Sequence, residues 1–202
     1  MKKLVLSFLL ILLLVTSSQL APATAATKYD FKNVNWGMTV NQVKKKEKSK
    51  LLDQGKVKDF SYLKYKTTGF RESATLTYIF YKNKLARTVY DIYPNDTKKT
   101  PSNKLDKYFS IKRDLLDEYD APFNNKDIIT SSGKNIPTYI GDLEDMVAGK
   151  VAFITEWFID KKRTSIVLLL AAENKVTFLQ VTYENNTLKY DLDELMRAQG
   201  IK

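Results

Sequence analysis

Residues 35–43, which read NWGMTVNQV, decide how the first half of this chain is built. Thr39 and Gln42 have the spacing of a capping box, in which each side chain satisfies a backbone N–H at the start of a helix. Gly37 allows a turn that a β-carbon would hinder, and Trp36 offers a large apolar surface that can hold the turn against a core. The stretch therefore predicts a tight entry turn followed by a helix.

Beyond the cap, the predicted helix has a thin apolar stripe and a lysine-rich surface. Val40, Val43, Glu47 and Leu51 follow helical spacing, and Gly55 is the expected end of this region. The lysines that flank the stripe between 41 and 50 are the candidate binding residues: Lys44, Lys45, Lys46, Lys48 and Lys50. The alternative is a solvated helix face without a specific partner.

The positive charge of the chain is concentrated in this region. The whole sequence has a net charge of +10, and residues 31–66 hold ten lysines against three acidic residues. A surface of this kind attracts an anionic wall polymer such as teichoic acid, an anionic lipid surface or an acidic envelope protein. It can equally serve only to keep the protein soluble. We expect no nucleic-acid partner, because the chain carries an export signal and no recognisable nucleic-acid-binding motif.

Residues 1–25 read as a secretory signal peptide. Two lysines precede an apolar run from Leu4 to Val15, and Ala23-Thr24-Ala25 matches the small-residue cleavage pattern. The run is short for a membrane span, although an uncleaved anchor is the alternative. The chain has no cysteine, so it can form neither a disulfide nor a lipid-modified cysteine. The sequence thus predicts a bacterial protein that is secreted or associated with the cell envelope, with no transmembrane segment after cleavage.

The next segment predicts antiparallel strands joined by tight turns. Tyr62–Tyr65 is a candidate strand, and Ala74–Tyr81 alternates apolar and polar residues before the turn at Asn83 and a partner strand at Leu85–Tyr93. Two prolines then mark an internal boundary. We expect four segments: a signal peptide at 1–25, a first helix-meander module at 26–93, a linker at 94–102, and a second helix-meander module with a C-terminal helix at 103–202.

The sequence of residues 103–202 predicts the same order of elements as residues 26–93, a helix followed by antiparallel strands. A helix over Asn103–Tyr119 precedes an irregular stretch with one helical turn near Leu143. The strands expected after it are Lys150–Ile159, Thr164–Ala172 and Val176–Tyr183. A C-terminal helix starting near Asp191 would bury Leu192, Leu195 and Met196. The predicted class is α+β, with two diverged helix-plus-antiparallel-meander modules and helices on one face of antiparallel sheet. One continuous sheet and two abutting sheets are both compatible with this pattern.

The motif around Trp36 resembles part of known bacterial envelope proteins. Its residues are Trp36, Gly37, Met38, Thr39 and Val43, and they lead through strands to a hairpin at 80–85. This arrangement is similar to the helix-plus-meander module of small outer-membrane assembly lipoproteins of the BamE/SmpA type and of the two-module β-lactamase inhibitory protein. The match covers residues 31–93, with a fainter echo from 103 to 184. The chain lacks the lipobox cysteine of the first group and the disulfides of the second. The resemblance implies a non-enzymatic, protein-binding scaffold.

Common catalytic residue types are missing from the sequence. Without histidine or cysteine, the chain cannot form a Ser-His-Asp or Cys-His arrangement or a metal site with His or Cys ligands, and it has no glycine-rich phosphate loop. We therefore predict no enzymatic activity, no cofactor and no metal site.

Acidic side chains leave one chemical alternative open. The candidates for a calcium site or an acid–base pair are Asp142, Glu144 and Asp145, and the further candidate carboxylates are Glu156, Asp117, Glu118 and Asp120. Solvated surface charges are the simpler interpretation. Glu156 lies among apolar residues, and an ion pair with Arg163 or Lys150 is the expected way to satisfy it.

These observations favour an exported binding protein without catalytic activity, which meets its partner on the sheet face or loops while the basic helix assists electrostatically. A carboxylate-dependent hydrolase or carbohydrate-active enzyme is the alternative, and a structural coat or matrix component is a further one. Tyrosines at alternating strand positions could stack on sugar rings, but sheet packing is the simpler interpretation. They are Tyr62, Tyr65, Tyr78, Tyr81, Tyr90 and Tyr93.

Overall fold

The computed structural model describes residues 30–94, 98–119, 122, 129–130, 142–159 and 161–188. The predicted signal peptide, the predicted C-terminal helix and part of the predicted linker lie outside these residues. The helices are α2 (Val40–Lys46), α3 (Pro101–Tyr119) and α4 (Asp142–Val147). The strands are β1 (Lys50–Val57), β2 (Phe60–Gly69), β3 (Glu72–Tyr81), β4 (Lys84–Ile92), β5 (Ile129–Thr130), β6 (Val151–Ile159), β7 (Thr164–Glu173) and β8 (Val176–Asn185).

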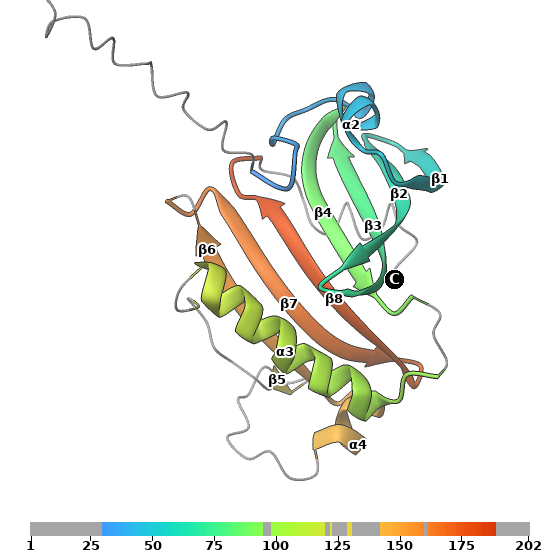
Figure 1. Cartoon of the computed structure of the whole chain (residues 1–202), viewed down its shortest axis with the longest axis vertical. Helices are drawn as coiled ribbons and strands as arrows, with labels where there is room; N and C mark the ends of the chain where they lie inside the picture. Colours follow the sequence, from blue (N-terminus) through green and yellow to red (C-terminus); the bar gives the residue numbers. More distant parts are fainter. Residues whose placement is uncertain are drawn as a thin grey trace, which may run out of the picture.

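All the strands belong to one antiparallel sheet with the order β1-β2-β3-β4-β8-β7-β6-β5 (Figure 1). Two meanders meet at its centre, where β4 pairs with β8 and Tyr90 lies opposite Val181. The two-residue β5 adds only a short edge beside β6. The α+β class is thus confirmed, and the sheet is continuous rather than divided in two.

The turns between neighbouring strands explain why the meanders form. Lys82 and Asn83 have φ values of 48° and 61°, and Asn174 and Lys175 have values of 50° and 64°. Two consecutive residues with positive φ match the type I′ turn, whose twist suits a two-residue hairpin. The predicted turn at Asn83 is therefore confirmed.

Helix α2 begins as predicted but is much shorter. Both hydrogen bonds of the Thr39–Gln42 capping box are present. The helix ends at Lys46 with Glu47 as its C-cap, and Lys50–Val57 forms the edge strand β1. The prediction of a helix reaching Lys50 was wrong, because the Glu47 carboxylate binds the Tyr78 hydroxyl at 2.7 Å and the Ser49 N–H at 2.8 Å. These two contacts turn the chain toward the sheet.

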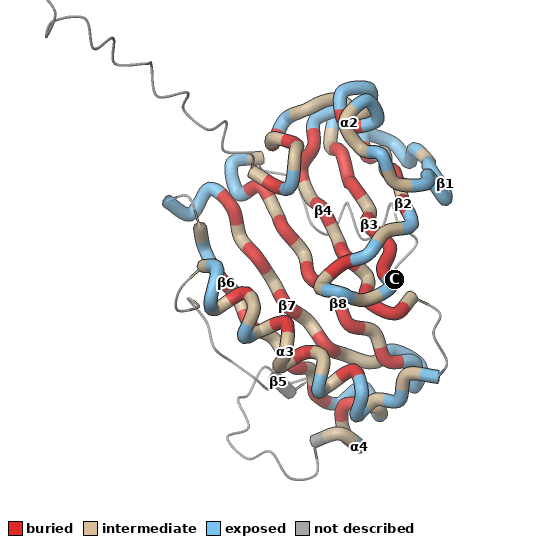
Figure 2. Tube along the Cα trace, viewed as in Figure 1, coloured by how far each residue is buried: buried red, intermediate tan, exposed pale blue. Residues whose placement is uncertain are grey.

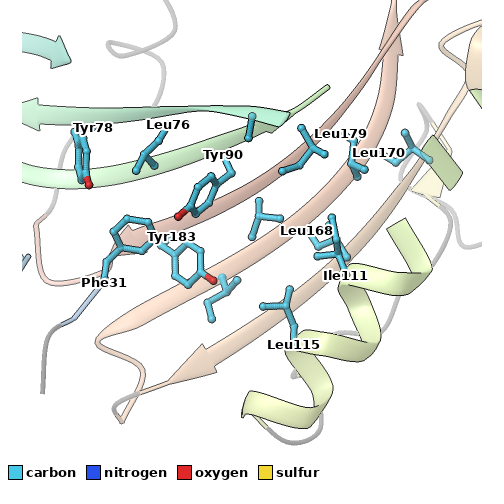
Figure 3. Close-up of a cluster of buried hydrophobic side chains, with 14 of the residues drawn as sticks. Phe31, Leu76, Tyr78, Tyr90, Ile111, Leu115, Leu168, Leu170, Leu179 and Tyr183 are labelled. Atoms are coloured by element: carbon cyan, nitrogen blue, oxygen red, sulfur yellow. The ribbon is translucent and has the colours of Figure 1, made fainter. Parts of the chain in front are cut away.

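Helix α3 covers the second meander with an apolar face. Its residues Tyr108, Ile111 and Leu115 are fully buried and belong to the main core cluster. Figure 3 shows Ile111 and Leu115 on the side of α3 that faces the strands of Leu168 and Leu170. The Tyr108 hydroxyl also meets Thr155 Oγ1 at 2.7 Å. Apolar burial of this extent is the main stabilising contribution to such a layer.

The other helices pack on the same face as α3. Val43 of α2 and Met146 of α4 are both fully buried in the main cluster. On the opposite face, Phe60 and Ile79 form a small separate cluster. The exposed parts of the first half are concentrated in α2 and β1 (Figure 2). We call the face that carries the helices the inner face.

Candidate functional site

The segment before α2 ties the two halves of the sheet together. We call residues 30–36 the N-terminal strap. The Asp30 carboxylate accepts hydrogen bonds from the Trp36 backbone N–H at 2.8 Å and from Arg163 at 2.9 Å. The Trp36 indole N–H donates to Thr164 Oγ1 at 2.8 Å in a buried contact. Because both anchors lie at the start of β7, the strap spans from the second half of the sheet to the first.

The rest of the predicted entry motif docks on β4. Gly37 has a φ of 82°, a conformation that suits glycine, and its N–H donates to the Leu85 carbonyl at 3.0 Å. The Leu85 N–H in turn donates to the Met38 carbonyl at 2.8 Å. The motif is therefore held in place by backbone hydrogen bonds to a strand more than forty residues later in the chain.

A cleft of about 560 Å³ opens on the inner face beside the strap. Its walls come from the strap, the β2–β3 turn, the end of α3, the end of β6 and the centre of the sheet. Five of its lining residues are aromatic: Phe31, Phe70, Tyr90, Tyr119 and Tyr183. We call this feature the aromatic cleft. The two halves of the protein contribute to it together.

The rings at the bottom of the aromatic cleft form one connected group. Phe31 lies at the centre, with its ring centroid 4.8 Å from that of Tyr183 and 5.7 Å from that of Tyr90 (Figure 3). Phe70 meets Tyr90 in an edge-to-face contact at 5.7 Å. Such geometries are the favourable ones for aromatic pairs. The floor is therefore a packed surface of rings in mutual contact.

The β2–β3 turn carries an unusual residue into the aromatic cleft. Phe70 and Arg71 have φ values of 51° and 66°, where a bulky side chain is strained and Asn-Gly is the preferred pair. Gly69 makes room for this turn, since a β-carbon there would lie 2.8 Å from the Tyr90 ring. Arg71 fixes the turn to α3 through two hydrogen bonds to the Asp114 carboxylate. Strain of this kind is typical of functional positions.

Two further buried tyrosines, Tyr65 and Tyr78, lie on the α2 side of the aromatic cleft. The Glu47 carboxylate accepts a hydrogen bond from the Tyr78 hydroxyl. Burial opposes ionisation of Glu47, but hydrogen bonds from Tyr78 and Ser49 and the charge of Lys32 outweigh it and lower its pKa to about 2. Lys32 Nζ lies 3.6 Å from the carboxylate. At neutral pH the Glu47 carboxylate therefore stays charged and holds the Tyr78 hydroxyl in one orientation.

Two tyrosine hydroxyls of the aromatic cleft, those of Tyr90 and Tyr183, are held in their neutral form. Burial, together with the charge of Glu47, raises the pKa of Tyr90 to about 12. Burial also raises the pKa of Tyr183, with Tyr119 and Glu118 adding to the effect. Neutral hydroxyls can both donate and accept hydrogen bonds, so the cleft offers apolar ring surface with polar tips.

The five predicted binding lysines do not line the aromatic cleft. Lys44 and Lys45 are exposed on α2, and Lys44 Nζ donates to Gln54 Oε1 at 2.6 Å. Lys46 is half-buried, Lys48 follows the helix, and Lys50 begins β1. The four exposed lysines are Lys44 and Lys45 on α2, Lys48 between α2 and β1, and Lys50 at the start of β1, so they do not lie on one helix face.

The acidic candidates are distributed over several elements. Asp145 of α4 pairs with Lys150 at 3.0 Å, and Arg163 pairs with Asp30, so both partners suggested for Glu156 are engaged elsewhere. Glu156 lies between the buried Thr155 and Trp157 and so points to the face opposite the core. Glu144 and Asp117 are exposed, Glu118 lies at the rim of the cleft, Asp142 begins α4, and Asp120 lies outside the described residues.

Comparison with known proteins found no matching family model, no matching curated protein and no matching solved structure. Within the described residues, no group of three or more acidic side chains is arranged to hold a metal ion. None of the described helices combines the length and the apolar character that a bilayer crossing requires.

The aromatic cleft was not predicted from the sequence, where sheet packing was the simpler interpretation of the tyrosines. One signal was present, because Phe70-Arg71 occupies a hairpin position where small or polar residues are preferred. Phe31 and Tyr119 gave no such signal, since their convergence depends on the packing of the N-terminal strap and α3 around the sheet.

Proposed function

We propose that this chain is an exported binding protein without catalytic activity, which holds an apolar segment of a protein partner in the aromatic cleft. The observation that carries the proposal is the convergence of five aromatic side chains, from separate segments of both halves, on one open cleft. A volume of about 560 Å³ lies in the range of established binding sites.

The chemistry of the cleft favours a protein segment as its occupant. Tyrosine and phenylalanine are enriched at the centres of protein interfaces, where rings supply apolar contact and hydroxyls supply hydrogen bonds. Lys32 and Glu118 at the rim of the cleft can orient charged groups of the partner. The exposed lysines around α2 would speed association with an acidic partner rather than provide most of the affinity.

The cleft is also preorganised, which lowers the entropic cost of binding. The strap is fixed by Asp30 and Trp36, the β2–β3 turn by Arg71, and the floor by ring contacts. A partner would therefore meet a surface that needs little rearrangement.

We further propose that the two halves are diverged copies of one helix-plus-meander module. A helix precedes each meander, and the last strands of the two meanders, β4 and β8, pair as antiparallel neighbours at the centre of the sheet. The last turn of each meander has two consecutive residues with positive φ, including Asn83 in one and Asn174 in the other. This origin would place the aromatic cleft at the junction between the copies.

Affinity capture with ring-deleted variants tests the proposed function. The mature chain and a Phe70→Asn variant are immobilised and exposed to envelope and medium fractions of the source organism over a salt series. Asparagine tolerates a positive φ, so the variant keeps the turn and loses only the ring. We expect a captured protein to be lost with Phe70→Asn and with Tyr119→Ala.

The matched control is Tyr81→Ala, which removes an aromatic ring that packs against Phe60 on the opposite face of the sheet. Capture should be retained by this variant. Equal capture by all variants, or no captured protein at low salt, would contradict the proposal. Turnover of an envelope polysaccharide or peptide by the mature chain would instead favour the enzymatic alternative.

A further inference from the structure

The edge strand β1 presents a second surface that the aromatic cleft does not use. Among the described residues, no strand pairs with the outer side of β1, which runs from Lys50 to Val57. Seven of its eight residues are exposed. In an antiparallel ladder, the N–H and C=O groups of every second residue point away from the neighbouring strand. The outer side of β1 is therefore a row of backbone donors and acceptors that can accept another strand.

The regular part of this edge is short and well defined. The register with β2 shifts between Leu51 and Asp53, which indicates a β-bulge at Leu52. From Asp53 to Val57 the pairing with β2 is uninterrupted. An added strand would therefore pair along these five residues.

Lysine side chains surround the same edge. Lys50 and Lys56 belong to β1 and Lys58 to the β1–β2 turn, whereas Lys45 lies in the last turn of α2 and Lys48 between α2 and β1; all five are exposed. We call this set the basic edge. Asp53, the acidic residue of the strand, accepts a hydrogen bond from the Tyr62 hydroxyl at 2.8 Å. Asp59 in the turn lies 3.8 Å from Lys82 Nζ. These two carboxylates offset only part of the charge of the five lysines, so the basic edge keeps a positive balance.

Apolar side chains accompany the lysines. Leu51, Leu52 and Val57 are 38%, 46% and 43% exposed, which is unusual for large apolar residues in an otherwise well-buried sheet. Lysines and bulges at an edge hinder pairing between identical chains. Exposed leucine and valine side chains on the same strand have the opposite effect, because they offer apolar contact to an added strand.

We propose that β1 binds an extended acidic polypeptide segment, which adds to the sheet as a further antiparallel or parallel strand along residues 53–57. Backbone hydrogen bonds align the segment, and its carboxylates face the lysines of the basic edge. A second copy of this chain is a less suitable occupant, because its own basic edge would bring like charges close together. Charge complementarity thus selects an acidic partner, and the exposed backbone row selects an extended one.

The test uses the mature chain and four synthetic nine-residue probes. The first alternates threonine and glutamate. The second and third have the same side chains, but every other backbone nitrogen is methylated, at odd positions in one and at even positions in the other. The fourth replaces glutamate with lysine. We expect the acidic probe to bind, N-methylation in one register to weaken binding at least tenfold, and the lysine probe not to bind. Equal binding of all acidic probes would overturn the proposal, because it would show attraction to charge alone.

Amide hydrogen exchange locates the bound probe. In residues 53–57, alternate amide hydrogens should exchange about tenfold more slowly when 90% of the chain is occupied, because only the unbound fraction exchanges. Amides of α2 should be unaffected. Protection of α2 without protection of β1, or concentration-dependent dimerisation through β1 without any probe, would overturn the proposal.

Charge variants complete the test. The pair Lys50→Gln and Lys56→Gln should weaken binding of the acidic probe about three- to tenfold at low salt. The matched control, Lys161→Gln with Lys175→Gln, removes the same charge from exposed turns of the second half and should change affinity less than twofold. The Phe70→Asn variant of the aromatic cleft should bind the acidic probe normally, so failure at β1 and failure of the proposed function are distinguishable.

Discussion

The two halves of the sheet differ in how their inner faces are covered. In the second half, the 19-residue α3 lies along β6, β7 and β8 (Figure 1). In the first half, the seven-residue α2 buries only Val43 and leaves β1 almost entirely exposed. The same order of elements therefore produces a closed layer in one half and an open one in the other.

The side chains of the two inner faces match this difference. Under α3 the strands present aliphatic residues such as Leu168, Leu170 and Leu179. Where the helix is short, they present Tyr65, Tyr78 and Tyr90 instead. A tyrosine can bury its ring while its hydroxyl reaches a polar partner, which an aliphatic residue cannot do. An incomplete helical layer is thus compatible with a stable sheet, and it leaves space for the aromatic cleft.

The largest effect is expected in the closed half. Leu115→Ala removes a fully buried side chain of α3 from the main core. It should lower the free energy of unfolding by about 2–5 kcal/mol, because the rigid neighbours cannot fill the cavity. Urea denaturation followed by circular dichroism measures the loss. Leu105→Ala, at a partly buried position of the same helix, should cost clearly less; equal losses would contradict a closed layer centred on Leu115.

Gly69→Ala tests the close contact at the border of the two halves. The new β-carbon would lie 2.8 Å from Cδ1 of the buried Tyr90, so the ring or the turn must move. We expect a loss of about 1–3 kcal/mol in the free energy of unfolding. Gly55→Ala is the matched control, because its β-carbon would meet the half-exposed Tyr62 ring, which can rotate into solvent. Equal losses in the free energy of unfolding for the two substitutions would contradict the expectation that the buried Tyr90 ring excludes a side chain at residue 69.

The pH dependence of stability probes the open half. The pKa of Glu47 is about 2 in the folded protein against 4.5 for the free side chain, so its contribution is complete above pH 4.5 and is lost as the pH falls toward 2. Glu47→Gln should lower the free energy of unfolding by about 1–2 kcal/mol at pH 7. Urea midpoints of the two proteins should converge between pH 4.5 and 2. A constant difference over this range would show that the charge of Glu47 is not involved.

The smallest effect is expected at the ion pair between the β2–β3 turn and α3. Arg71→Ala removes an arginine whose side chain is 72% exposed, so the free energy of unfolding should fall by less than about 1 kcal/mol. The difference should shrink as salt is added. Lys82→Ala, at a weaker surface pair on the opposite side of the first half, provides the comparison. A larger loss in the free energy of unfolding that does not depend on salt would show that Arg71 stabilises the protein by more than a surface ion pair.

Most of the secondary structure was predictable because its signals are local. The capping box at Thr39, the alternation of β3 and the turn at Asn83 each depend on residues within a few positions of one another. The end of α2 was not predictable in this way. Leu51 matches helical spacing, yet it lies 38% exposed on a strand. The contact that ends the helix joins Glu47 to Tyr78, 31 residues later.

An α+β protein with a capped first helix, two meanders and a strongly basic first half can be predicted from the amino-acid sequence, because composition, periodicity and turn chemistry act at short range. Long-range packing makes the sheet continuous, leaves β1 at its edge, and brings Phe31, Phe70 and Tyr183 together in one cleft. Those outcomes depend on contacts such as Trp36 with Thr164, which join residues 128 positions apart. No local pattern specifies such a pair, since many aromatic and hydroxyl side chains could satisfy each other before the sheet assembles.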